Sequence, residues 1–177
     1  MASDQRERDS VELQSAAFHE AGHAIAAMEC RVKLTQVSIV ADGDRRGYCA
    51  VSIPDLDPLN DGQAKTKTRY RLENLAIVAL SGVAAEEMYL GHEPIGGFDS
   101  DVDRVGDYLS RLSDSDPEIR AYFRWIHERA KALVGKPMNT ALVERLAEAL
   151  LERGELGQKV VRSIRADSIA NTFPRRI

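Results

Sequence analysis

Two histidines and a glutamate in residues 18–24 have the types and spacing for metal-assisted hydrolysis. The segment reads Phe-His-Glu-Ala-Gly-His-Ala, so His19, Glu20 and His23 form an H-E-x-x-H motif. A helix turns about 100° per residue, so both imidazoles lie on nearly the same face and can reach one metal ion. The Glu20 carboxylate can take a proton from an attacking water molecule and pass it to a leaving amine. The motif predicts one Zn²⁺ bound by His19 and His23, with Glu20 as general base and acid.

The residues around the motif indicate a buried helix. Apolar residues cover most of its circumference, namely Ala16, Ala17, Phe18, Ala21, Ala24, Ile25, Ala27 and Met28. Two histidines and a glutamate inside such a helix need polar partners, and a metal ion satisfies all three together. The alternatives are a chance match, which is rare in a chain with four histidines, and ordinary capped polar residues, which the apolar neighbours argue against.

The composition excludes several classes of protein. The chain has 177 residues, of which 44% are hydrophobic and 29% charged, as in a soluble protein with one good core. A formal net charge of -4 and the lack of a basic stripe argue against a nucleic-acid partner. There is no apolar secretion signal and no apolar run of membrane-spanning length. Cys30 and Cys49 lack a metal-binding spacing and are interpreted as reduced thiols, so we expect a cytoplasmic protein without a membrane segment.

Hydrophobic periodicity predicts a mainly α-helical fold with a small β-sheet or hairpin, of the α+β class. Helices are expected over residues 10–30, 64–90, 101–112, 117–134 and 139–153, and strands over residues 34–40 and 48–53. The chain is thereby divided into a flexible N-terminal arm (1–9), one domain (10–165) and a C-terminal tail (166–177). Small residues on the second helix would admit the motif helix closely, namely Ala79, Ser81, Gly82, Ala84 and Ala85.

Two histidines leave a catalytic zinc site incomplete, because such sites usually have three protein ligands. The extended motif with a third histidine found in metzincins is absent, since Ala24, Ile25 and Ala26 follow His23. Spacing and residue type leave the third ligand open among Glu86, Glu87, His92, Asp99, Asp101, Asp103 and His127.

Four stretches occur in a fixed order along the chain. They are His-Glu-Ala-Gly-His-Ala at 19–24, GYCAVSIP at 47–54, LSGVAAEEMYLG at 80–91 and GFDSDVDRV at 97–105. In this order they resemble the zinc-peptidase domains of FtsH-type AAA+ proteases, and a weaker likeness extends the resemblance over residues 15–164. The resemblance implies a helical zinc-peptidase domain with the H-E-x-x-H motif on a buried helix.

The resemblance also implies roles for individual residues. Asp101 matches the third metal ligand of that family, whereas its residue type alone also fits an acid that stabilises a helix N-terminus. Glu86 falls on the helix that the resemblance places against the motif helix, and we expect it to orient an imidazole; a surface carboxylate in an ion pair is the alternative.

A further prediction concerns the second strand. An exposed strand edge can bind an extended substrate through main-chain hydrogen bonds. The candidate residues are Tyr48, Cys49, Ala50, Val51, Ser52 and Ile53. A purely structural hairpin is an equal alternative.

The chain departs from the FtsH-type pattern in several respects. It has no Walker motif, ATPase module or transmembrane helix, so we expect no energy-dependent unfolding of substrates. Val83 replaces an arginine of the family pattern, and the stretch before Pro117 is shorter, which leaves oligomeric packing and some substrate contacts open.

The sequence therefore predicts a zinc-dependent endopeptidase that cleaves unfolded or flexible polypeptide segments without an ATPase of its own. A separate ATPase or adaptor could deliver the substrate. Two alternatives remain: a zinc-bound regulatory or interaction protein with little turnover, and a narrow-specificity regulatory protease. The physiological substrate, the oligomeric state and the metal bound in vivo stay open.

Overall fold

The structure, a computed structural model, describes residues 2–41, 47–53, 66–94 and 99–172. In these ranges the elements are α1 (Ala2–Glu29), β1 (Lys33–Ser38), β2 (Tyr48–Ser52), α2 (Thr66–Leu90), α3 (Asp99–Ser110), α4 (Asp116–Val134), α5 (Pro137–Arg153), β3 (Glu155–Gly157) and α6 (Gln158–Thr172). The predicted mainly α-helical fold with a small β-sheet is confirmed. None of the helices in these ranges combines the length and the apolar character needed to cross a membrane.

Helices α1 and α2 form the centre of the fold because both are rich in small and apolar residues. On α1, Ala17, Ala21 and Ala24 are completely buried. A Cβ atom at Gly22 would collide with the main-chain oxygen of Ser81 and with the side chain of Ala85, so glycine is required where the two helices meet. The prediction that small residues of α2 admit the motif helix is therefore confirmed.

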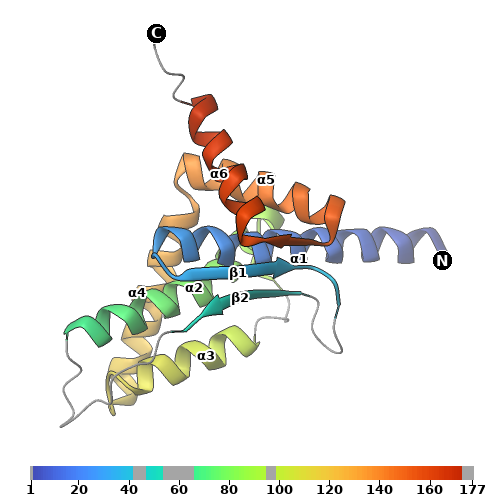
Figure 1. The fold of residues 1–177 in the computed structure, drawn as a ribbon. Coiled ribbons are helices and arrows are strands. Elements are labelled where there is room, and N and C mark those ends of the chain that lie inside the picture. Colours follow the sequence, from blue (N-terminus) through green and yellow to red (C-terminus); the bar gives the residue numbers. More distant parts are fainter. Residues whose placement is uncertain (1, 42–46, 54–65, 95–98, 173–177) are drawn as a thin grey trace.

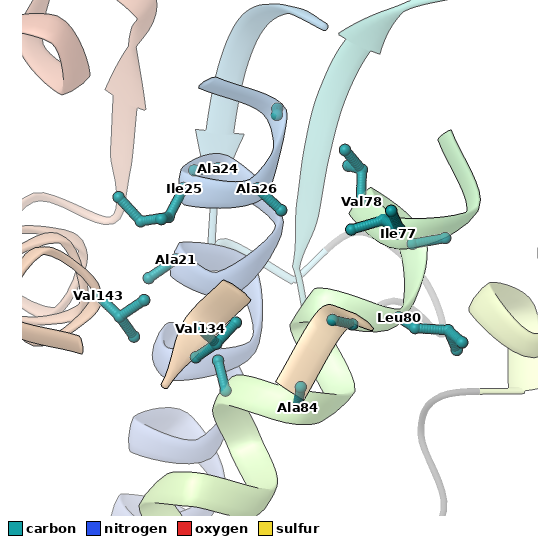
Figure 2. Packing of buried hydrophobic residues seen from close by; sticks show 14 of the residues in the cluster. Ala21, Ala24, Ile25, Ala26, Ile77, Val78, Leu80, Ala84, Val134 and Val143 are labelled. Atoms are coloured by element: carbon teal, nitrogen blue, oxygen red, sulfur yellow. The ribbon is translucent and has the colours of Figure 1, made fainter. Parts of the chain in front are cut away.

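The other helices complete the core around this pair. Figure 2 shows Val143 of α5 beside Ala21 of α1, and both residues are completely buried. Val134, at the end of α4, is also completely buried in the same hydrophobic cluster. This packing holds α1 and α2 in place and removes the motif half of α1 from solvent.

The sheet is antiparallel, with the strand order β2-β1-β3. β1 pairs Leu34 with Val51 and Ser38 with Tyr48 of β2, with one irregularity between Leu34 and Gln36. Figure 1 shows α3 on the side of β2, and α5 and α6 on the side of β3. Since β2 pairs only with β1 among the described residues, its other edge is open to an added strand.

Several element boundaries differ from the sequence-based expectation. α1 begins at Ala2 and not near Ser10, since the polar residues before Ser10 include good helix formers and neither glycine nor proline. α6 continues to Thr172, well into the expected tail, and the three-residue strand β3 was not predicted. The division of the chain at residues 9 and 165 stays a prediction. The expected loop over residues 54–62 lies outside the described residues.

Candidate metal centre

Three helices bring five polar side chains into the protein interior. α1 carries His19, Glu20 and His23, α2 carries Glu86, and Asp101 lies in the first turn of α3. Each of these residues is at most 8% exposed. Because buried ionisable groups are costly without partners, their positions relative to one another carry the chemistry of the site.

His19, His23 and Asp101 converge on one point. The Nε2 atoms of the two histidines are 3.0 Å apart, and Oδ2 of Asp101 lies 3.0 Å from His19 Nε2 and 3.3 Å from His23 Nε2. Two imidazole nitrogens and a carboxylate oxygen this close together form a donor set that zinc accepts. The three residues therefore fit a metal ion.

The other candidates for the third ligand lie elsewhere. Glu87 forms an ion pair with Lys131, and His92 is exposed and contacts the main-chain oxygen of Glu93. Asp99 and Asp103 are also exposed. Among the described residues, the candidate metal cluster consists of His19, His23 and Asp101.

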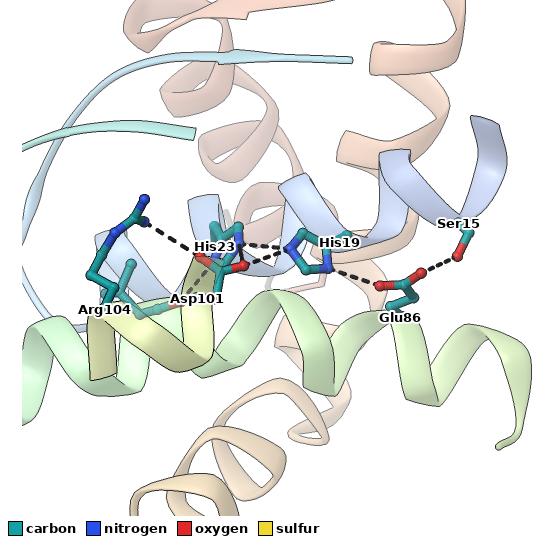
Figure 3. Close-up of polar contacts among 7 residues, drawn as sticks. Ser15, His19, His23, Glu86, Asp101 and Arg104 are labelled. Atoms are coloured by element: carbon teal, nitrogen blue, oxygen red, sulfur yellow. Dashed lines mark hydrogen bonds and ion pairs between the residues drawn. The ribbon is translucent and has the colours of Figure 1, made fainter. Parts of the chain in front are cut away.

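The Nδ1 atoms of both histidines are held by other groups, which turns the Nε2 atoms toward the shared point. His19 Nδ1 lies 2.9 Å from Oε2 of Glu86, whose Oε1 accepts a 2.5 Å hydrogen bond from the Ser15 hydroxyl. His23 Nδ1 donates to the main-chain oxygen of Val78 at 2.8 Å. Figure 3 shows Ser15, Glu86 and His19 in one row with these contacts. A buried position of Glu86 excludes the surface ion pair considered from the sequence.

Two glycines let the main chain approach the site closely. A Cβ atom at Gly82 of α2 would collide with the imidazoles of both His19 and His23. A Cβ atom at Gly47, just before β2, would lie 3.0 Å from Oε1 of Glu20 and 2.7 Å from the main-chain oxygen of Ser38. Sequence reasoning assigned Gly82 only to helix packing and missed Gly47, because such contacts depend on the tertiary fold.

The electrostatics of these buried groups favour a cation at the shared point. Burial lowers the pKa of His19, but hydrogen bonds with Asp101 and Glu86 outweigh burial and raise this pKa to about 10. Burial raises the pKa of Asp101, but His23 and His19 outweigh burial and hold it well below its usual range. The carboxylates of Asp101 and Glu86 thus stabilise a positive charge at the shared point, which a bound metal ion would supply.

Glu20 differs from the other acidic groups of the site. Burial raises its pKa, and the charges of His23 and His19 oppose the shift. Its Oε2 atom is buried and has no hydrogen-bond partner within the described part of the chain. A buried carboxylate oxygen without a partner is costly unless a bound molecule donates a hydrogen bond to it, so Glu20 suits contact with a proton donor in the cleft.

A cleft of about 440 Å³ opens onto this group of residues. Its walls include Glu20, the residues Tyr48, Cys49, Ala50 and Val51 of β2, and Arg104 and Tyr108 of α3. The cleft therefore places most of the predicted substrate strand beside the candidate metal centre. Ser52 and Ile53 are exposed and lie outside the cleft, and sequence reasoning did not single out Arg104.

Replacement of Gly82 by alanine tests how the α2 main chain supports the imidazoles. The added methyl group would displace His19 and His23, so zinc affinity should fall at least about tenfold, as when groups that orient metal-bound histidines are removed. Competition with a chromophoric chelator measures the affinity, and circular dichroism checks folding. Gly106→Ala on α3 is the matched control, because a Cβ atom there meets nothing within 4 Å. Unchanged zinc affinity in a folded Gly82→Ala variant would contradict this geometry.

Comparison with known proteins gives one family. The model of peptidase family M41 matches residues 6–113, a range that contains the H-E-x-x-H motif, Glu86 and Asp101. No curated protein matches the chain. Because the matched range covers more than half of the 177 residues, the chain belongs to peptidase family M41.

Proposed function

We propose that the protein is a zinc-dependent endopeptidase in which His19, His23 and Asp101 hold the metal ion and Glu20 is the general base and acid. Membership of a peptidase family supports a metallopeptidase type of function. The observation that carries the finer proposal is the convergence of three ligand atoms in a cleft that Glu20 also lines, with one Glu20 oxygen that has no hydrogen-bond partner among the described residues. These are the groups that metal-assisted hydrolysis of a peptide bond requires.

Each of the buried residues has a separate role in the proposed hydrolysis. When bound, zinc supplies a Lewis acid that lowers the pKa of water and polarises the scissile carbonyl. Glu86 and the main-chain oxygen of Val78 hold the Nδ1 protons of His19 and His23, so the Nε2 lone pairs stay directed at the metal position. Oε2 of Glu20 takes the proton of the attacking water and then delivers it to the leaving amine.

The position of β2 supports a polypeptide substrate. β2 borders the cleft and leaves one edge without a paired strand among the described residues. An extended chain added to this edge would form main-chain hydrogen bonds and pass directly over the cleft. Only unfolded or flexible segments can adopt this arrangement, since the main chain of a folded protein is already hydrogen-bonded.

These residues do not contain a module that could unfold a folded substrate. The 177 residues contain no Walker motif that could bind a nucleotide and drive unfolding. We therefore propose that these residues cleave segments that are already extended, and that any folded target is opened by an ATPase or adaptor beyond them.

The glutamate variant Glu20→Gln tests the proposed reaction. Reduced casein, which is permanently unfolded, should be cleaved by the zinc-loaded protein and not in the presence of a chelator. The variant should lose at least about a hundredfold in rate, because glutamine cannot transfer the proton, while zinc affinity stays close to that of the wild type. Mass spectrometry of the fragments measures cleavage.

A second glutamate provides the matched control for this experiment. Glu87 neighbours Glu86 on α2 but pairs with Lys131 outside the cleft, so Glu87→Gln should cleave casein normally. Cleavage by Glu20→Gln at the wild-type rate would contradict the assignment of Glu20.

The substrate strand has its own test. Binding of an unfolded peptide to zinc-loaded Glu20→Gln should slow amide hydrogen exchange in β2 (Tyr48–Ser52), because the added strand protects the open edge. β3 (Glu155–Gly157), at the opposite side of the sheet, should exchange at its original rate. Protection of β3 or of distant helices, with β2 unchanged, would argue for a purely structural hairpin.

A further inference from the structure

Arg104 is the one arginine or lysine among the described residues that line the cleft. It lies on α3, three residues beyond Asp101, so both side chains project from the same face of the helix. Figure 3 shows Arg104 at the end of the row of site residues opposite Glu86 and Ser15. The proposed hydrolysis assigns no role to this guanidinium.

The contact between Arg104 and Asp101 leaves most of the guanidinium available. Nη1 lies 3.4 Å from Oδ1 of Asp101, which is long for a charge-assisted hydrogen bond, and the Arg104 side chain is 49% exposed. The second oxygen of Asp101 faces His19 and His23, so that carboxylate is shared between the arginine and the candidate metal position. A guanidinium has five N–H donors, of which this contact uses one.

Arg104 also lies close to the path of an added substrate strand. Arg104 lines the same cleft as Glu20 and the β2 residues 48–51. The guanidinium therefore borders the space between the proposed general base and the strand edge. A chain extended along β2 would carry its side chains past this cation close to the scissile bond.

We propose that Arg104 determines specificity by binding a glutamate or aspartate side chain of the substrate next to the scissile bond. The planar guanidinium matches a carboxylate with two parallel hydrogen bonds, whereas a lysine or arginine of the substrate would meet a like charge. Glu86 does not compete for Arg104, because its two oxygens are engaged by Ser15 and His19 at the other end of the site. This inference rests on the proposed function, since it names the substrate class of the same cleft.

A binding experiment tests the inference without turnover. Zinc-loaded Glu20→Gln is titrated into fluorescent extended peptides of neutral residues, in which one glutamate is moved along the sequence, with glutamine and lysine counterparts. At one position or two adjacent positions, glutamate should bind about tenfold more tightly than glutamine, with lysine weakest, because a charge-assisted hydrogen bond is gained. The difference should shrink at high ionic strength.

Variants at position 104 separate a specificity role from a merely structural one. In the Glu20→Gln background, Arg104→Gln should remove the preference, Arg104→Lys should keep part of it, and Arg104→Glu should reverse it in favour of the lysine peptide. Arg111→Gln is the matched control, because Arg111 follows α3 but lines a different cavity. It should retain the full preference.

Each result bears on one of the two proposals. Peptide binding with equal affinity for glutamate and glutamine at every position, or a preference that survives in Arg104→Gln, overturns the role of Arg104. Binding with the expected preference, together with no cleavage of casein by the zinc-loaded wild type, supports Arg104 and overturns the endopeptidase function. The absence of binding by every peptide overturns the role of Arg104, and cleavage of casein by the wild type then decides the endopeptidase function.

Discussion

The close approach of α1 to α2 is the constraint on which the site depends. Gly22 lets the two helices meet, and Gly82 lets the main chain of α2 lie against the imidazoles of His19 and His23. The same approach brings the main-chain oxygen of Val78 and the carboxylate of Glu86 to the two Nδ1 atoms. One helix contact thus buries the histidines, fixes their ring orientations and directs both Nε2 atoms to a common point.

Because the site is buried, the charges of its side chains must be balanced by one another or by a bound ion. Charged groups in a low-dielectric interior need partners of opposite charge, and the site contains three carboxylates around two histidines. Glu86 is satisfied by Ser15 and His19, and Asp101 faces both imidazoles. Oε2 of Glu20 is left without a hydrogen-bond partner in the described structure, and Glu20 lines the cleft together with β2. The arrangement suits a metal ion held by three residues and a proton acceptor beside it.

The sequence could predict the parts of the site that depend on local geometry. His19, Glu20 and His23 follow from helical spacing, and the mainly α-helical fold follows from periodicity. Asp101 is separated from His19 by 82 residues, and only the family resemblance indicated it as the third ligand. Spacing along the sequence does not show which distant acidic residue the fold places beside the two histidines. Gly47, the main-chain oxygen of Val78 and Arg104 were missed, since their importance comes from tertiary contacts. β3 has three residues, too few for a recognisable period.

X-ray absorption at the zinc edge tests most directly that His19, His23 and Asp101 bind one metal ion. The protein loaded with one equivalent of zinc should show two imidazole nitrogens at about 2.0–2.1 Å, carboxylate or water oxygens at about 2.0–2.2 Å, and no sulfur. The Asp101→Ala variant should retain the imidazole signal and lose the carboxylate contribution. A sulfur ligand at about 2.3 Å, which Cys49 in the cleft wall could supply, or fewer than two imidazoles, would contradict the account.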